Sequence, residues 1–468
     1  MSKPFYLGID LGTSSVKGIL RSPDGQTRKA RCGYTGPAPK CWKNAVKELI
    51  GQLTAMADGV ISAVAISSQV GTYLVNDTDV IPWHSQAGAQ ELSYILSRIP
   101  QDVFVREISM PHPALISYPL PRLMYIQKLY GPDCSVLMPK DLLIREFTGE
   151  TVTDMYSMRG IANLTTCQYA QSLLEELDIR ISLPPLKKPT DLAGYVTSQG
   201  AEKYGLPEGT PVYLGCNDFF AGLLGMGICH NGDAFDLTGT SEHIGYISPE
   251  ITHEGFVSGG YFTGNCTYGG TKASGTSCSF AIEHFGKIQS SLQEMLHSAP
   301  PLFLPYLKGE RAPIFDENAR GVYFGLNENT DHSAMSYAAF EGVVFSLYHI
   351  AQNMSMPTPA KLICGGGAAH DPLLNTLKAT LFQCPVLPVC ENETSAMGAC
   401  ILAMTGSGYY LSLEDACSDC VAYDQAILPN EECQELLLQR FAVFKELYPA
   451  LQTSFAHFHN ISTKRSTL

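Results

Sequence analysis

The sequence predicts an α/β protein made of two related halves, and two observations carry this prediction. Along the first seventy residues, short apolar runs alternate with a segment of helical spacing, which is typical of an α/β architecture. The stretch 234–241, AFDLTGTS, also repeats the pattern of 8–14, GIDLGTS, with one residue inserted before the glycine. Asp10 and Asp236 thus lie close to half of the 468-residue chain apart, which favours an internal duplication with one phosphate-cradling turn per half. A chance match between two short strings is the alternative at this point.

The first half opens with a predicted β-hairpin. Residues 5–10, FYLGID, have the apolar character of a buried strand, residues 12–14 form a turn, and residues 16–20 return to β character. Helical spacing follows over 43–57, and a further strand over 63–66. The tip of the hairpin is small and rich in hydroxyl groups, which suits a turn that cradles phosphate.

The composition excludes several classes of protein. Hydrophobic residues make up 45% of the chain and charged residues only 16%, against a typical charged share of about 25%, so disorder, collagen and coiled coil are ruled out. The formal net charge is −14 without a long basic run, which disfavours nucleic-acid binding.

No membrane or secreted character is expected either. The most apolar stretch, 212–229, carries Asn217 and Asp218 and four glycines, which argues against a membrane helix. The N-terminus lacks a signal-peptide pattern, so a cytoplasmic protein is predicted. Fifteen cysteines, an odd number with many in apolar runs, suit reduced core thiols, and a role for the pair Cys417 and Cys420 is left open.

A third glycine cluster follows an apolar run. Residues 362–364 read as a strand, residues 365–367 are three glycines, and an amphipathic helix begins near 372. Such a turn lets backbone approach a ligand while a helix N-terminus supplies amide donors to anionic groups. A plain strand-to-helix turn is the alternative, but it needs only one or two glycines. Since no GxxxxGKS/T string occurs, a nucleotide would be held without a P-loop.

Two aspartates are candidates for chemistry. Asp218 stands between a short strand and an apolar helical run, where it could take a proton from a substrate hydroxyl; the alternative is helix capping by Asp218 or Asn217. Asp10 ends a buried strand, so its carboxylate needs a partner or a cation such as Mg²⁺. Asp236 could serve likewise or cap a turn.

Taken in order, these motifs resemble those of the FGGY carbohydrate kinases of the actin-like and hexokinase-like ATPase superfamily, over nearly the whole chain. The matching stretches are the first phosphate motif (8–17), PKDLLIREFTGETVTD (139–154), GCND ending in the catalytic aspartate (215–218), the second phosphate motif (239–241), PYLKGERAP (305–313) with ARGVYFGL (319–326), the adenosine motif GGGA (365–368) and ETSAMGA (393–399).

The resemblance implies two ribonuclease-H-like domains, 1–232 and 233–468, with ATP and a sugar in the cleft between them. It implies an ATP-dependent sugar kinase with Asp218 and Asp10 as catalytic residues and Asp10 as a ligand of Mg²⁺. It leaves homodimer formation open and implies no nucleic-acid or membrane partner. The nucleotide contacts that it implies are Gly12, Thr13, Ser14, Ser15, Lys17, Gly239, Thr240, Gly321, Gly366, Gly367, Ala368 and Asp371.

The departures from the family pattern bear on the substrate. Where xylulokinases carry GQMHG, this chain has Gln69, Val70, Gly71 and Thr72, with Gly71 in place of histidine. The usual WxDxR reads Trp83–Ala87, WHSQA, without Asp and Arg. Two other family stretches are imperfect in ways not assigned to the substrate: Arg122 stands where Lys is usual, and Ala334 stands where a polar residue is usual. An unpaired buried hydroxyl costs about 1–3 kcal/mol, so D-xylulose is predicted to be a poor substrate compared with another ketose, a polyol, a smaller sugar or a sugar acid. The predicted sugar contacts are Gln69, Val70, Gly71, Thr72, Trp83, His84 and Asp218.

Two other classes of function are weighed against the kinase. A regulatory protein that binds sugar and nucleotide but turns over weakly fits the altered turns, yet it has no need of the base Asp218. An actin-like or chaperone-like ATPase shares the phosphate turns, but it has no need of the PYLKGERAP stretch. The sequence therefore favours the sugar kinase.

Overall fold

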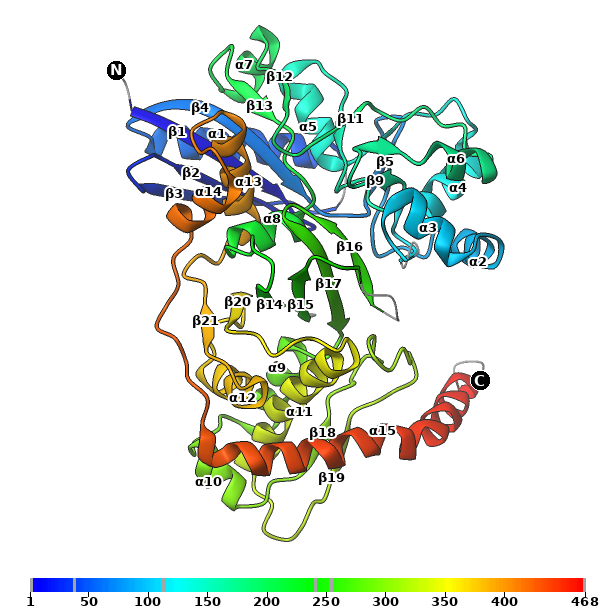
Figure 1. Ribbon diagram of the computed structural model, residues 1–468, viewed down its shortest axis with the longest axis vertical. Helices are drawn as coiled ribbons and strands as arrows, with labels where there is room; N and C mark the ends of the chain where they lie inside the picture. Colours follow the sequence, from blue (N-terminus) through cyan, green and yellow to red (C-terminus); the bar gives the residue numbers. More distant parts are fainter. Residues whose placement is uncertain (1–2, 37–38, 112–114, 240–241, 252–255, 466–468) are drawn as a thin grey trace. The chain divides into compact units, whose positions relative to one another are not determined.

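The computed structural model describes residues 3–36, 39–111, 115–239, 242–251 and 256–465. The chain forms two compact units (Figure 1). The first unit comprises Met1–Cys229, Ser258–Asn265 and Glu393–Ala422, and the second comprises His230–Val257, Cys266–Asn392 and Tyr423–Leu468. The predicted domains, 1–232 and 233–468, differ from these units in one respect: the segments 258–265 and 393–422 belong to the first compact unit. The division into two functional domains at residue 232 stays a prediction.

The first unit is built on a six-stranded sheet of order β12-β13-β4-β1-β2-β3. Strand β1 pairs antiparallel with β2 and parallel with β4, and β13 pairs parallel with β4. Seven consecutive buried residues in β1 show that the sheet is covered on both faces. The strands are β1 (Lys3–Leu11), β2 (Ser15–Arg21), β3 (Thr27–Gly33), β4 (Gly59–Ser68), β12 (Leu192–Tyr195) and β13 (Pro211–Tyr213).

Two helices cover opposite faces of this sheet. Gly18 in β2 lies against Leu49 and Leu53 of α1 (Pro39–Met56). Gly8, whose Cβ would point to the other face, lies against α13 (Thr394–Gly406), where that Cβ would come 2.0 Å from the carbonyl oxygen of Ala396. These contacts explain why glycines interrupt otherwise apolar strands: the helices approach too closely for any side chain.

Helix α13 also packs closely on α8 (Asp218–Gly225) within the first unit. A Cβ on Gly398 would lie 1.7 Å from the carbonyl oxygen of Ala221, and one on Gly225 would lie 1.9 Å from that of Thr394. The helix that carries Asp218 is therefore held closely against a helix from late in the chain, and that helix in turn packs on the sheet.

The rest of the first unit surrounds this core. A buried ion cluster joins Lys140 to Asp141 at 2.6 Å and to Asp154 at 2.8 Å, which gives the 139–154 motif a structural role. The remaining elements are β5 (Tyr73–Val75), β6 (Asp79–Ile81), α2 (Ala89–Arg98), α3 (Gln101–Ile108), α4 (Pro119–Tyr130), β7 (Val136–Leu137), α5 (Pro139–Thr148), β8 (Thr153–Asp154), β9 (Ala162–Asn163), β10 (Gln168–Tyr169), α6 (Gln171–Glu176), β11 (Leu186–Lys187), α7 (Ser198–Tyr204) and α14 (Leu413–Cys420).

A second six-stranded sheet has the order β16-β17-β15-β14-β20-β21. Its strand β14 carries Asp236, pairs antiparallel with β15 and parallel with β20, and so repeats the arrangement of β1 with β2 and β4. This repetition agrees with the duplication that the two GTS-like strings predict. The strands are β14 (Ala234–Thr238), β15 (Glu242–Ser248), β16 (Val257–Tyr261), β17 (Gly264–Thr271), β20 (Leu362–Gly366) and β21 (Val386–Pro388).

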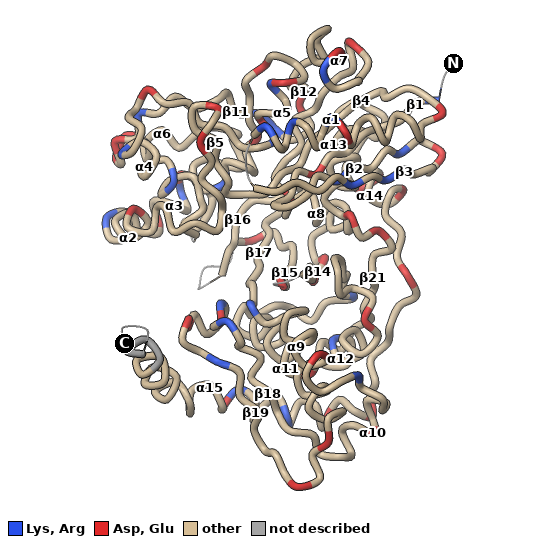
Figure 2. Tube along the Cα trace, turned by 180° about the vertical axis from the view of Figure 1, so that it is seen from behind, with Lys and Arg blue, Asp and Glu red and all other residues tan. Residues whose placement is uncertain are grey.

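The core of the second unit forms around α11 (His332–Asn353), most of whose residues are buried. The other elements are α9 (Gly275–Phe285), α10 (Leu292–His297), β18 (Leu302–Leu304), β19 (Val322–Phe324), α12 (Pro372–Phe382) and α15 (Glu431–Arg465). Lys and Arg, and the more numerous Asp and Glu, are scattered along the trace (Figure 2). All fifteen cysteines are unbridged and twelve of them are buried, which confirms the prediction of core thiols. Among the described residues, no helix is both long and apolar enough to cross a bilayer.

Candidate active site

The first phosphate turn joins β1 to β2 and is held by its own backbone. The amide of Gly12 donates to the carbonyl oxygen of Ser15 at 3.1 Å, and the amide of Tyr34 donates to that of Ser14 at 3.0 Å. Thr13 and Ser14 are exposed at the tip, whereas Ser15 is buried. Lys17, on β2, forms an ion pair with Glu393 at 2.6 Å. The turn therefore presents hydroxyl groups and backbone at the end of a rigid hairpin.

Asp10 lies buried at the end of β1, beside this turn. Its Oδ1 accepts a hydrogen bond from the Ser67 hydroxyl at 2.9 Å. Burial raises the pKa of Asp10 to about 6, although Ser67 and Lys17 favour the charged form.

Asp218 is the first residue of α8, and it is not the capping residue. The side chain of Asn217 accepts a hydrogen bond from the amide of Phe220 at 2.9 Å and so caps the helix. Oδ1 of Asp218 accepts from the amides of Phe219 at 2.9 Å and Val70 at 3.3 Å. Loss of hydration raises the pKa of Asp218 to about 7, and the negative charge of Asp10 adds to this shift. Capping by Asn217 thus leaves Asp218 available for another role.

Asp10 and Asp218 lie near enough to each other within the first unit for the charge of Asp10 to raise the pKa of Asp218. Both are oxygen donors, which Mg²⁺ prefers, and each has a raised pKa because a carboxylate in this environment is poorly hydrated. A cation beside them would favour the charged forms that burial disfavours.

The predicted sugar turns meet the first phosphate turn through hydrogen bonds. The Trp83 indole Nε1 donates to the Thr13 hydroxyl at 3.2 Å, and that hydroxyl donates to Oε1 of Gln69 at 3.3 Å. The amide of Trp83 donates to the buried Thr72 hydroxyl at 3.2 Å. Trp83 is 41% exposed, and the exposed His84 ring packs edge-on against it at 5.4 Å between ring centroids. Residues assigned separately to nucleotide and to sugar thus form one connected group.

The structure explains the glycine at position 71. Its φ is 77°, in the left-handed region, and an added Cβ would lie 2.6 Å from Cβ of Ser117. A histidine at this position is therefore incompatible with the present backbone.

The second unit contains the predicted second phosphate and adenosine turns. Gly239 is exposed just beyond β14, whereas Thr240 lies outside the described residues. The Thr238 hydroxyl accepts a hydrogen bond from the amide of Ala368 at 2.8 Å, which ties the two turns together. Gly366 has a φ of 94°, and its Cβ would come 2.1 Å from the carbonyl oxygen of Thr238. Only glycine allows this close approach.

The other residues predicted to contact nucleotide lie in different settings. Gly367 is exposed, and no heavy atom lies within 4 Å of where its Cβ would be. Asp371 caps α12 by accepting from the amides of Leu373 and Leu374 at 3.0 and 2.9 Å. Gly321 precedes β19 and packs against Leu307 and Phe303. The hydrogen bond from Ala368 to Thr238 thus connects the 238–239 and 366–368 turns, whereas Gly321 contacts a different part of the second unit.

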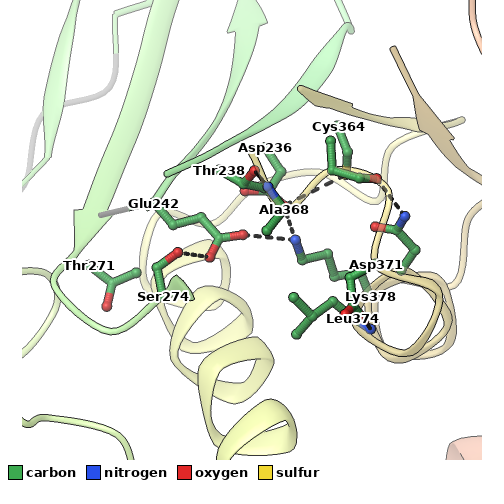
Figure 3. A network of polar contacts seen from close by, with 12 residues as sticks. Asp236, Thr238, Glu242, Thr271, Ser274, Cys364, Ala368, Asp371, Leu374 and Lys378 are labelled. Carbon is green, nitrogen blue, oxygen red and sulfur yellow. Dashed lines mark hydrogen bonds and ion pairs between the residues drawn. The ribbon is translucent and has the colours of Figure 1, made fainter. Parts of the chain in front are cut away.

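Asp236, which the sequence suggested as a metal ligand or turn cap, instead forms a buried ion pair with Lys378 of α12 (Figure 3). Lys378 also pairs with Glu242 at 2.8 Å, and the hydroxyl of Ser274 lies 2.8 Å from Glu242 Oε2 and 3.0 Å from the carbonyl oxygen of Gly239. Burial works against the charge on Lys378, but the two carboxylates raise its pKa well above the usual value. Sequence reasoning missed Lys378, Glu242 and Ser274; the one signal was a lysine inside the apolar helix PLLNTLKATLF.

Comparison with known proteins identifies the family. The N-terminal domain of the FGGY family of carbohydrate kinases matches residues 5–225, and the C-terminal domain of that family matches residues 238–407. The chain belongs to the FGGY family of carbohydrate kinases. This FGGY chain is therefore a sugar phosphotransferase, and ATP is the phosphoryl donor of its family.

Individual relatives of this FGGY kinase cover nearly its whole length. It is 28% identical to a xylulose kinase of Lactococcus lactis over 95% of this chain and 96% of the relative. A crystal structure of gluconate kinase from Lactobacillus acidophilus superposes with a TM-score of 0.84 at 26% identity, covering 98% and 100% of the two chains. A ligand-bound xylulose kinase from the same organism gives a TM-score of 0.84 at 26% identity, covering 97% and 100%.

These matches confirm the predicted family, the fold and the kinase activity class. They do not favour the alternative of a weakly active regulatory protein.

Proposed function

We propose that this FGGY kinase uses Asp218 to activate a hydroxyl of a small sugar or sugar acid, and that D-xylulose is not its preferred substrate. The role of Asp218 as the base is supported by its hydrogen bonding and its pKa. Asp218 is relieved of capping by Asn217, and its pKa of about 7 suits a general base at neutral pH.

The proposed reaction is a direct transfer. The sugar hydroxyl gives its proton to the Asp218 carboxylate while its oxygen attacks the γ-phosphorus of ATP. The bond from the γ-phosphorus to the bridging oxygen breaks, and its electron pair leaves with ADP. Asp218 then releases the proton to solvent.

The nucleotide contacts are proposed to divide between the two phosphate turns and the adenosine turn. Gly12, Thr13, Ser14 and Ser15, together with Gly239 and Thr240, would hold phosphates through backbone amides and hydroxyls, and Lys17 would add a positive charge. Gly366, Gly367 and Ala368 would lie against adenosine. Asp10 would hold Mg²⁺, which when bound supplies positive charge to the phosphate oxygens.

The altered sugar turns support the second part of the proposal. A histidine at position 71 would collide with Ser117. Ser85 and Ala87 stand where the usual pattern has Asp and Arg, and the neighbouring Trp83 and His84 are exposed. A site built for particular hydroxyls rejects ligands that lack them and penalises hydroxyls that find no partner. Relatives that act on xylulose and on gluconate are both similar to this chain, so both substrate classes belong in the test.

Steady-state kcat/KM over ketoses, aldoses, polyols and sugar acids, followed by ADP release, tests this proposal. We expect D-xylulose to rank below at least one other compound, with D-gluconate as the reference sugar acid. If D-xylulose leads the panel by about tenfold, which corresponds to about 1.4 kcal/mol, neighbouring side chains have replaced the lost contacts and the specificity proposal is wrong.

Replacing Gly367 with Leu should raise KM for ATP by about tenfold or more while leaving KM for the sugar nearly unchanged, because the side chain would enter the space proposed for adenosine. The position is well suited to this test, since an added Cβ meets no protein atom within 4 Å. Gly51→Leu is the matched control at another open glycine, on helix α1. Equal losses for ATP and sugar would indicate a folding defect at the turn instead.

A further inference from the structure

Arg122, on α4, is a fully buried cation whose hydrogen-bond partners within the described part of the chain are all neutral. Its Nη1 donates to the Ser85 hydroxyl at 2.7 Å. Its Nη2 donates to the carbonyl oxygens of Pro82, Trp83 and Ser85 at 3.2, 3.1 and 3.1 Å. Four acceptors from one short turn therefore converge on one guanidinium group.

Two departures from the family pattern meet in this contact. Arg122 stands where lysine is usual, and Ser85 stands where the WxDxR pattern has aspartate. Without a carboxylate at position 85, a cation at position 122 has to be satisfied by hydroxyl and carbonyl oxygens. A planar fork with five N–H donors can reach several such acceptors at once, whereas an ammonium group is a compact point charge on a flexible stem.

The turn that Arg122 holds carries the exposed Trp83. Its indole donates to Thr13, and Thr13 donates to Gln69, so the orientation of Trp83 is fixed at both its backbone and its ring. The first phosphate turn has independent support from its own backbone hydrogen bonds. Loosening the 82–85 turn should therefore disturb Trp83 more than it disturbs the phosphate turn.

We propose that Arg122 is a positioning residue, which holds the Pro82–Ser85 turn so that Trp83 is fixed against Thr13 as one wall of the sugar site. The assignment of this wall to the sugar rests on the proposed function above. The hold of Arg122 on Trp83 does not depend on that assignment, because all the groups concerned lie in the first unit.

Tryptophan fluorescence tests the structural part without any substrate. The chain has two tryptophans: Trp42 is completely buried and Trp83 is 41% exposed, so acrylamide quenching reports mainly on Trp83. Arg122→Lys should raise the quenching constant by about twofold, because an indole released from its hydrogen bond moves on the ps–ns timescale. Ser85→Ala, which removes one of the four acceptors, should give a smaller rise. Arg145→Lys is the control, since Arg145 pairs with Asp77 elsewhere in the same unit and should leave quenching unchanged.

Kinetics test the functional part with D-xylulose and D-gluconate as probes. In Arg122→Lys, kcat/KM for the better of the two should fall about 10- to 100-fold, as expected for a misplaced binding group, while KM for ATP stays within about threefold. Unchanged quenching in both Arg122→Lys and Ser85→Ala would overturn the proposal and leave Arg122 a packing residue. Should Arg122→Lys fail to fold, Ser85→Ala decides the question alone. If the unaltered protein phosphorylates no sugar, the proposed function fails, and increased quenching still supports the hold on Trp83.

Discussion

Replacing Asp218 with Asn is expected to lower kcat by roughly 10²–10⁴-fold, because the amide has the size of the carboxylate but cannot accept the proton of the attacking hydroxyl. The helix should be unaffected, since Asn217 provides its cap. Binding of ATP, measured by calorimetry on the same variant, should persist. A variant that phosphorylates sugar at the original rate would show that Asp218 is not the base.

The pH dependence of the same pair of proteins separates a catalytic effect from a folding defect. In the unaltered protein, kcat/KM should fall as the pH drops below about 7, the pKa of Asp218, because the protonated acid is not a base. Because folding raises the pKa of Asp218, the contribution of this carboxyl group to the free energy of unfolding is greatest at low pH. That contribution is lost as the pH rises from about 4 through about 7. Asp218→Asn should therefore unfold at a higher temperature than the unaltered protein at pH 8, and at a similar temperature at pH 4. Loss of activity together with loss of stability at pH 8 would contradict the assignment.

Replacing Lys378 with Met is expected to destabilise the second unit by about 3–5 kcal/mol, because it leaves Asp236 and Glu242 buried without their cation. Urea unfolding followed by circular dichroism measures the change. Lys287→Met serves as the control, since Lys287 is exposed in the same unit and its loss should cost no more than about 0.5 kcal/mol.

The cause of this loss can be checked by removing the charges that it leaves behind. The variant should be less defective at pH 5 than at pH 8, because buried carboxylates without a cation take up protons as the pH falls. Adding Asp236→Asn and Glu242→Gln to Lys378→Met should recover part of the stability. A defect of equal size at both pH values would mean that packing of the lysine stem, and not charge, is what matters.

The sequence predicted the local elements well because each is determined by residues close together in the chain. The apolar run that ends in Asp10 forms β1, the segment 43–57 falls within and just beyond α1, and the strand before the three glycines forms β20. The order of motifs also identified the family before any fold was known.

The partners of the buried charges could not be predicted in the same way. Lys378 lies 136 residues from Glu242, so its place inside an apolar helix indicates that it needs a partner but does not indicate which one. For Asp236 the sequence left two roles open, a metal ligand and a turn cap, whereas in the structure Asp236 forms an ion pair with Lys378. The link from Trp83 to Thr13 likewise depends on two turns that are 70 residues apart.

Helix α13 has a consequence for how the protein is made. The sheet of the first unit is complete in sequence by residue 213, but the helix that covers one of its faces begins at Thr394. At a synthesis rate of about 5–20 residues per second, a ribosome needs on the order of ten seconds or more to reach that helix. During this time one face of β1 and β4, shaped by Gly8 to receive a helix backbone, is apolar and uncovered. We therefore expect the nascent first unit to expose an apolar sheet face until α13 has been made, and a fragment that stops near residue 230 to aggregate rather than fold.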